Sequence, residues 1–430
     1  MRAASAPPHR PFLRPPVWIA AGFAGLVFFI AAVSRFGQNR EPIAEKASSI
    51  SESVALPAGK TADAAPPFPL SDERAAEPAL RTGTDAADFY KDAFALFDAL
   101  TEEEKKMLAR PTEEVDAEAA RALFGKIQPI MELLRHAAAA DYCDWGFGPI
   151  DFESPLPHLG KAQNLAKVAL WNAAYRFPSE AAGAIGDLAA RARLGHDVAE
   201  TVIGLLMEAS FDKSANHLLR QNAASLDAAA AEQARAFLAG STLDGDIARA
   251  MQTEASGSRA MLEKLAAQSA GERVQFAAAY GLNSENAGAD DRAAAQRVEE
   301  ILRDSAQLKV EMEFLKQTQT EMIEAMTWPG DRFRAWSQEI QAKAREHPLA
   351  AVSLPVFEGI HARLEEARVQ RAMLGAGLDV LQNGTASLAQ ARDPVTGRGF
   401  AYVPKPGGFE LQSAFQVKGK PVTMNFAKPE

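Results

Sequence analysis

Residues 160–195 carry the pattern that decides the fold class, GKAQNLAKVALWNAAYRFPSEAAGAIGDLAARARLG. Alanine and other strong helix formers dominate it, and Pro178-Ser179-Glu180 interrupts the run as the start of a new helix does. Similar segments follow, so helices are predicted at 160–176, 179–195, 197–220, 225–239 and 244–268. Short turns at Gly195, Gly240 and Gly257 make these helices antiparallel hairpins, in a bundle or a short superhelical array.

The composition of the whole chain is that of a large, acidic, mainly helical protein. Its 430 residues are 47% hydrophobic, 24% charged and 8% aromatic, and the formal net charge is −10. This length allows two or three packed domains. The acidic balance argues against a nucleic-acid binder, and one cysteine excludes an intrachain disulfide, a thiolate zinc finger or an iron–sulfur cluster.

An apolar segment lies near the N-terminus. Residues 17–33 read VWIAAGFAGLVFFIAAV, without a charged or strongly polar side chain. A helix of this length spans about 26 Å, slightly less than the ~30 Å hydrocarbon core of a bilayer, so a single transmembrane helix is predicted. The three arginines of residues 1–16 favour a cytoplasmic tail and an extracytoplasmic bulk. A cleaved signal peptide, with the site Ala32-Val33-Ser34, is the alternative.

The rest of the chain divides by composition and periodicity. Residues 34–85 are rich in Ser, Ala, Glu and Pro and lack an apolar period, which predicts a disordered tether. The predicted order is a tail at 1–16, a transmembrane helix at 17–33, a flexible linker at 34–85, a helical domain at 86–280, a long helical hairpin at 290–390 and a small antiparallel β-sheet at 391–430. Within the helical domain, Thr101-Glu-Glu-Glu104 and Thr112-Glu-Glu-Val115 read as helix starts.

The long hairpin is predicted from apolar residues that recur every seven positions. These are Ile301, Leu308, Leu315 and Met322 in 290–326, and Phe357, Leu364 and Leu378 in 356–383. Such a narrow apolar seam suits two long antiparallel helices. Trp328-Pro329-Gly330-Asp331 breaks the chain between them, and a further helix is expected at 331–346. Polar seam residues (Ser305, Gln319 and Arg371) favour an intrachain hairpin, with a homodimer as the alternative.

The C-terminal residues follow a different period. Apolar side chains alternate in three runs, at Phe400 and Tyr402, at Phe409, Leu411, Phe415 and Val417, and at Val422, Met424 and Phe426. Alternation separated by Gly- and Pro-containing turns predicts three short antiparallel strands. Since a small isolated sheet is unstable, its apolar face should pack against the helices.

Two blocks of the chain carry a resemblance to known families. One includes Asp141-Tyr-Cys-Asp-Trp-Gly146 and Leu156-Pro-His-Leu159, and the other runs from Arg371 to Ser413. Together they resemble uncharacterised membrane-anchored helical proteins of bacterial envelopes. The second block, with its turn Asp393-Pro-Val-Thr-Gly397, also resembles the C-terminal part of secretion-system pseudopilins. The resemblance implies a single-pass protein of the bacterial inner membrane whose bulk is periplasmic. A pseudopilin has a Glu inside its apolar helix, and this chain has none there, so only the topology is transferred.

The loop at 139–158 has the densest mixture of reactive side chains. Its candidate binding residues are Asp141, Cys143, Asp144, Trp145 and His158. A thiol, carboxylates and an imidazole can bind a metal or form a nucleophile–base pair, but no C-x-x-C or H-E-x-x-H spacing is present. The structural alternative is that Cys143 and Trp145 pack into the core while the acids cap helices. No metal or cofactor is expected.

Two weaker patterns in the sequence are explained by structure and do not indicate a functional site. Glu358-x-x-His361 is half of a di-iron carboxylate motif without a second copy, so a solvated pair beside the seam is expected. The glycines Gly183, Gly186 and Gly204, inside predicted helices, read as points of close packing.

No nucleophile elbow, phosphate loop or dinucleotide fingerprint appears in the sequence. The leading hypothesis is therefore a non-enzymatic envelope protein, anchored in the lipid bilayer through residues 17–33, whose helical domain binds other envelope proteins. One alternative is an enzyme or metal-binding module centred on the 141–158 loop. Another is a carrier of a small molecule or lipid, with a cavity between helices.

Overall fold

The computed structural model describes residues 83–146, 156–279, 292–349 and 357–427. These residues form a mainly helical protein with one three-stranded antiparallel sheet at the C-terminal end, which confirms the predicted class. The predicted transmembrane helix at 17–33 and almost all of the linker at 34–85 lie outside the described residues. None of the described helices is long and apolar enough to cross a bilayer.

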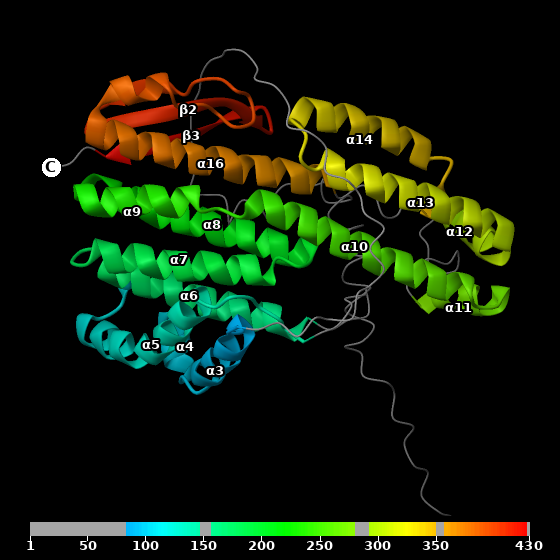
Figure 1. Ribbon diagram of the computed structural model, residues 1–430, viewed down its shortest axis with the longest axis horizontal. Helices are drawn as coiled ribbons and strands as arrows, with labels where there is room; N and C mark the ends of the chain where they lie inside the picture. The colour runs from blue at the N-terminus through cyan, green and yellow to red at the C-terminus, as the bar shows by residue number, and fades with distance from the viewer. Residues whose placement is uncertain (1–82, 147–155, 280–291, 350–356, 428–430) are drawn as a thin grey trace, which may run out of the picture.

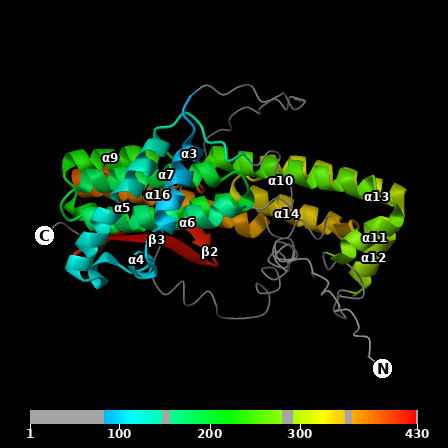
Figure 2. The same ribbon diagram turned by 90° about the horizontal axis from the view of Figure 1, so that it is seen from below.

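The elements are α3 (Ala86–Asp98), α4 (Glu102–Met107), η1 (Thr112–Glu114), α5 (Ala117–Ala138), α6 (Pro157–Arg176), α7 (Ala181–Val198), α8 (Val202–Asn222), η2 (Ala223–Ser225), α9 (Ala228–Ala239), α10 (Leu243–Ala266), α11 (Ala270–Ala279), α12 (Arg292–Arg303), α13 (Ser305–Ala325), α14 (Gly330–Ala344), α16 (Phe357–Asn383), η3 (Thr385–Ala389), β1 (Ala401–Lys405), β2 (Gly408–Val417) and β3 (Lys420–Ala427). Figure 1 shows them stacked in layers, from α3–α5 through α6 and α7, then α8 and α9, to α16 and the sheet. Helices α10–α14 extend away from this stack as an arm (Figures 1 and 2).

One of the two predicted helix starts in the first layer is confirmed. The side chain of Thr101 accepts a hydrogen bond from the Glu104 N–H, and Glu104 bonds back to the Thr101 N–H, which is a complete capping box. At Thr112 the chain makes only the short turn η1. The long helix α5 starts later, because Asp116 is the residue whose carboxylate accepts from two first-turn N–H groups.

Two of the three turns predicted from glycine are wrong. Gly195 lies inside α7 and Gly257 lies inside α10, whereas Gly240 does end α9. A glycine within a strong helical pattern does not end a helix by itself when tertiary packing holds the turn. At Gly195 that packing is tight, since an added Cβ would lie 3.2 Å from the Cγ of Glu208 on α8.

The predicted long hairpin at 290–390 is not formed as expected. Its first half is split into α12 and α13, because the Asp304 carboxylate accepts from the Ala306 and Gln307 N–H groups and starts a new helix. Helix α13 then packs along α10, while α16 packs against α8, α9 and the sheet. The seven-residue repeat identified apolar faces correctly, but it does not specify which helix each face meets. The helix predicted at 331–346 is confirmed as α14.

The C-terminal sheet is formed as predicted. β2 lies in the middle, with Tyr402 opposite Leu411 on one side and Leu411 opposite Met424 on the other. Its apolar face packs on α16, where Gly377 allows very close approach. A Cβ at this position would lie 1.9 Å from the Phe426 ring.

The prediction that Glu358 and His361 are both solvated is correct for Glu358 and wrong for His361. Glu358 is exposed, but His361 is 2% exposed and stacks on Phe333 with ring centroids 3.9 Å apart. One ring nitrogen of His361 also lies 3.0 Å from the carbonyl oxygen of Trp328. His361 is buried because α14 covers the start of α16, a contact that the sequence of α16 alone does not contain.

Candidate functional site

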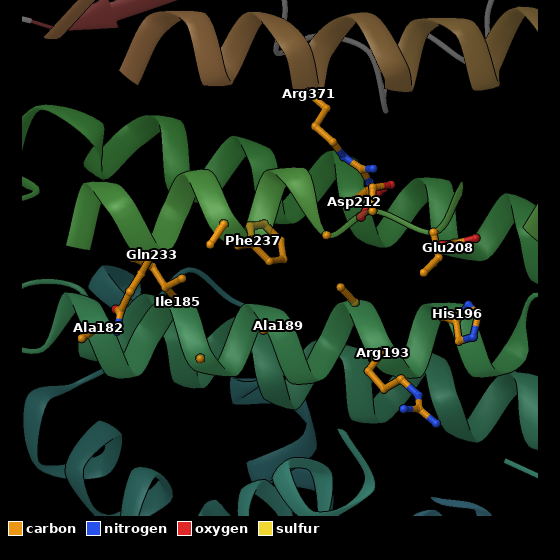
Figure 3. A pocket seen from close by; sticks show the side chains of 16 residues that line it. Ala182, Ile185, Ala189, Arg193, His196, Glu208, Asp212, Gln233, Phe237 and Arg371 are labelled. Atoms are coloured by element: carbon orange, nitrogen blue, oxygen red, sulfur yellow. Dashed lines mark hydrogen bonds and ion pairs between the residues drawn. The ribbon is translucent and has the colours of Figure 1, made fainter. Parts of the chain in front are cut away.

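A groove of about 590 Å³ lies between α7, α8, α9 and α16 (Figure 3). It is lined by Ala182, Ile185, Gly186, Ala189, Ala192, Arg193, His196, Glu208, Asp212, Gln233, Ala236, Phe237, Gly240, Ser241, Thr242 and Arg371. None of these residues belongs to the loop from which a site was predicted.

One side of the groove is a stripe along α7. The stripe consists of Ala182, Gly186, Ala189, Arg193 and His196, whose alternating spacing of four and three residues puts them on a single helix face. An added Cβ at Gly186 would meet no atom within 4 Å, so the expectation of close packing at this glycine is wrong. Small side chains on this face leave room that larger ones would fill.

The remaining predicted packing glycines have different environments. At Gly204 the expectation is confirmed, because an added Cβ would lie 1.8 Å from the carbonyl oxygen of Val198. At Gly183 the nearest atoms belong to the side chains of Arg176 and Glu180, which can move.

The lining changes character along the groove. One end is formed mainly by apolar side chains, including Ile185 on α7 and Phe237 on α9, with Gln233 among them. The other end holds the ionisable residues, including Glu208 and Arg371 (Figure 3). A hollow with one apolar end and a few convergent polar groups is the usual form of a site for a small molecule.

Two buried carboxyl groups lie together at the polar end. Glu208 is 4% exposed, and burial together with the charge of Asp246 raises its pKa to about 8. Burial opposes ionisation of Asp246 as well, but hydrogen bonds from His196 and Thr242 hold its pKa below the usual value. His196 Nδ1 and Arg249 Nη2 each lie 2.8 Å from an Asp246 oxygen. At neutral pH, Glu208 therefore keeps its proton and Asp246 carries the negative charge.

Arg371 enters the groove from the opposite side. Its side chain reaches from α16 toward α8 and forms an ion pair with Asp212 through one terminal nitrogen (Figure 3). Burial lowers the pKa of Arg371 to about 10, so the guanidinium remains charged at neutral pH. Within the described part of the chain, its Nε and second terminal nitrogen have no acceptor.

A second, more polar hollow of about 290 Å³ adjoins the groove. It is lined by Asp141, Tyr142, Cys143, Arg193, His196, Asp197, Glu200 and Arg249. Arg193 and His196 line both hollows. Arg193 is held between them, since its Nε lies 2.9 Å from both Asp197 carboxylate oxygens and a terminal nitrogen donates to the Ala140 carbonyl.

The five residues predicted from the sequence separate into two structural settings. Trp145 is 7% exposed and His158 is 5% exposed, and their rings lie 4.6 Å apart in the core. Trp145 also donates its indole N–H to the Asp197 carbonyl at 2.7 Å, and burial lowers the pKa of His158 to about 4. These two side chains brace the first helices against α7.

The other three lie nearer the surface. The Asp141 carboxylate accepts from the Thr84 N–H at 2.7 Å, and that of Asp144 accepts from the Gly146 N–H at 2.9 Å. Cys143 is half-buried, and burial raises the pKa of its thiol, which favours the protonated form. Asp141 and Cys143 line the second hollow, whereas Asp144 lines neither. In the described ranges, no cluster of three or more His, Cys, Asp or Glu residues could hold a metal ion.

The groove residues were not predicted from the sequence, although one of them, Arg371, occupies an unusual position in it. Arg371 is a charged residue at a seam position, which indicated only that α16 is not a free-standing coiled coil. In the structure that arginine meets Asp212 of α8, which lies 159 residues earlier in the chain. Glu208 and Asp212 are four residues apart, on one buried face of α8, and a carboxyl pair on such a face is the pattern to look for.

Comparison with known proteins adds no further constraint. No family model, no curated protein and no solved structure matches the chain.

Proposed function

We propose that this protein binds a small amphiphilic molecule in the groove between α7, α8, α9 and α16, and that it acts as a binding protein or carrier. The graded lining of the groove carries this proposal: Ala, Gly, Ile and Phe side chains at one end, and paired charges at the other. Its volume, about 590 Å³, falls in the range of natural small-molecule sites.

The small residues of α7 support a binding role. Ala182, Gly186 and Ala189 are exposed to the groove although they lie on a helix that is enclosed by neighbours on its other faces. A helix that served only for packing would gain stability by filling this space with larger apolar side chains. The hollow is therefore best explained by a ligand that occupies it.

The proposal includes the predicted location. A helix at 17–33 would tether the protein to the bacterial inner membrane and place the groove in the periplasm. Amphiphilic molecules released from the bilayer would be available to the groove there. Binding of other envelope proteins remains a further expectation from this layout.

Ligand binding can be tested on the full chain in lipid nanodiscs, with empty nanodiscs as background. The probe is anilinonaphthalene sulfonate, whose fluorescence reports apolar sites, displaced by decanoate or decanol. Gly186→Leu and Ala189→Leu should each weaken displacement by about tenfold or more, because a side chain would occupy the groove. Ala122→Leu, at an exposed position on α5, is the matched control and should bind as the natural chain does. Unchanged binding in both groove variants would refute the proposal.

A further inference from the structure

Hydrogen-bond donors converge at the polar end of the groove. Arg371 brings two N–H-bearing nitrogens that have no acceptor among the described residues, and the hydroxyl group of Ser241 also lines this end. The Thr242 hydroxyl lines it too, but it already donates to Glu208 Oε1 at 3.4 Å. A guanidinium that has further N–H groups beside its ion pair can bind an anion through charge-assisted hydrogen bonds. The donors therefore favour an anionic group at this position.

The start of α10 adds to this positive character. Gly240, Ser241 and Thr242 line the groove and lead into α10, a helix of 24 residues. Thr242 occupies the N-cap position, yet its side chain makes no capping hydrogen bond. The N-terminus of a long helix carries a partial positive charge and unsatisfied N–H groups, which stabilise a bound anion.

The acidic residues near this end are paired with cations or uncharged, so they oppose a single negative charge only weakly. Asp212 is paired with Arg371, and Asp246 is held by His196 and Arg249. Asp244, in the first turn of α10, is paired with Arg368 at 2.7 Å. Glu208 is the remaining carboxyl group that lines the groove, and its raised pKa keeps it neutral at pH 7.

Glu208 brings a further polar atom to this end of the groove. The residue is 4% exposed, and its Oε2 atom receives no hydrogen bond from any donor in the described ranges. A buried polar atom without a partner is destabilising and is uncommon away from functional sites. A protonated Glu208 has a proton to donate, which the neighbouring Asp246 carboxylate or an anionic oxygen of a ligand can accept.

We propose that the ligand of the groove is an acyl carboxylate, with its head group on Arg371 and the start of α10 and its chain along the small residues of α7. This inference rests on the proposed function. A single negative charge suits the site better than a doubly charged phosphate, because Asp212 and Asp246 lie close to it. From Arg193 to Ala182 the stripe spans about 17 Å, which accommodates a chain of medium length.

The head group is tested with matched ten-carbon probes on the full chain in nanodiscs: decanoate, decanol, decylamine and decyl phosphate. Decanoate should displace the fluorescent probe at a concentration at least about tenfold lower than decanol. Equal displacement by decanoate and decanol, or tighter binding of decylamine or decyl phosphate, would overturn the assignment. If decanol alone binds and the groove-filling variants abolish it, the proposed function stands while this inference fails. If no probe binds, both fail.

A test of the role of Arg371 requires a variant that still folds. The double variant Arg371→Gln with Asp212→Asn removes both charges of the pair, so no buried charge is left unpaired. It should lose the preference for decanoate over decanol while decanol binding stays the same. Arg371→Lys keeps the charge but not the flat two-point contact, and it should give an intermediate preference. Arg363→Gln, at an exposed position about two turns earlier on α16, is the control and should leave the preference intact. A preference that survives in the double variant would contradict the assignment.

Discussion

At the scale of single residues, the same residue type takes opposite roles on neighbouring helices. Gly204 lets α8 begin directly against the backbone of Val198, whereas Gly186 opens a hollow. A similar contrast separates two buried acids: Asp246 is ionised because His196 and Arg249 surround it, and Glu208 is neutral because it is buried beside Asp246, which is already charged. The environment, and not the side chain, decides what each residue does.

The two glycines should respond in opposite ways to alanine. Gly204→Ala should lower the free energy of unfolding by about 1–3 kcal/mol, because its Cβ would force the Val198 backbone to move. Gly186→Ala should raise it by about 0.5–1 kcal/mol, because alanine favours the helix and its Cβ meets open space. Urea unfolding followed by circular dichroism measures both. Equal effects of the two substitutions would contradict this account of the packing.

Glu208 should make stability depend on pH. Its pKa rises from an ordinary value of 4.5 to about 8, so the folded chain holds a proton that the unfolded chain has lost. Stability contributed by this group is therefore present below pH 4.5 and is lost as the pH rises through 8. Glu208→Gln should flatten that fall and leave the variant more stable than the natural chain at pH 8.5, by an amount of the order of 1 kcal/mol.

Urea unfolding at several pH values from 5 to 8.5 tests this prediction. The control is Glu118→Gln, at an exposed position of α5, which should leave the pH profile unchanged. If Glu208→Gln lost stability more steeply with rising pH than the natural chain does, the folded chain would not hold the extra proton on Glu208.

At the scale of elements, buried arginines connect helices that apolar contacts alone would leave free to slide. Arg191 on α7 is 4% exposed and donates to the Ala166 carbonyl on α6 at 2.8 Å, to the Phe211 carbonyl on α8 and to Ser214 Oγ at 2.7 Å. Three helices are thus fixed around the wall of the groove. Burial lowers the pKa of Arg191 to about 9, so the guanidinium remains charged at neutral pH.

Loss of this arginine should be costly. Arg191→Ala should lower the free energy of unfolding by about 2–4 kcal/mol, because it leaves a cavity and removes the buried hydrogen bonds that join α7 to α6 and α8. Arg121→Ala, on an exposed face of α5, should change it by less than about 0.5 kcal/mol. Thermal and urea unfolding provide the measurement, and a similar effect of the two substitutions would argue against a linking role.

At the scale of the whole molecule, the layers place the groove in the middle of the stack. Helices α6 and α7 lie on one side of it, and α16 with the sheet lies on the other (Figure 1). The arm of α10–α14 leaves from the polar end, since α10 begins beside Thr242. A change in how α10 packs would therefore alter the part of the groove that binds the proposed head group.

The location of the molecule can be tested directly. In bacterial cells the full chain should stay in the membrane fraction after a carbonate wash, because the apolar helix predicted at 17–33 would resist extraction. A fusion of alkaline phosphatase after Lys60 should be active, which reports a periplasmic position. A mature chain that starts at Arg35 would instead establish the cleaved signal peptide, and an inactive fusion would contradict the predicted orientation.

Much of the local structure was predictable from short patterns. Alternation from Phe400 to Phe426 predicted all three strands, and the capping pattern at Thr101 predicted the start of α4. The errors occur where a long-range contact overrides a local signal, as at Gly195 and at His361. The groove was missed because its wall looks like an ordinary helix until its neighbours leave one face uncovered.

The sequence by itself determined the helical class, the C-terminal strands and many helix boundaries, because propensity, periodicity and capping act over a few residues. Only the tertiary structure decided that α13 meets α10, that His361 is buried and that Arg371 meets Asp212. These pairings depend on which surfaces fit when all the helices pack at once. The groove is a result of that fit: small side chains on one face of α7 remain uncovered, while charges from α8 and α16 converge at one end.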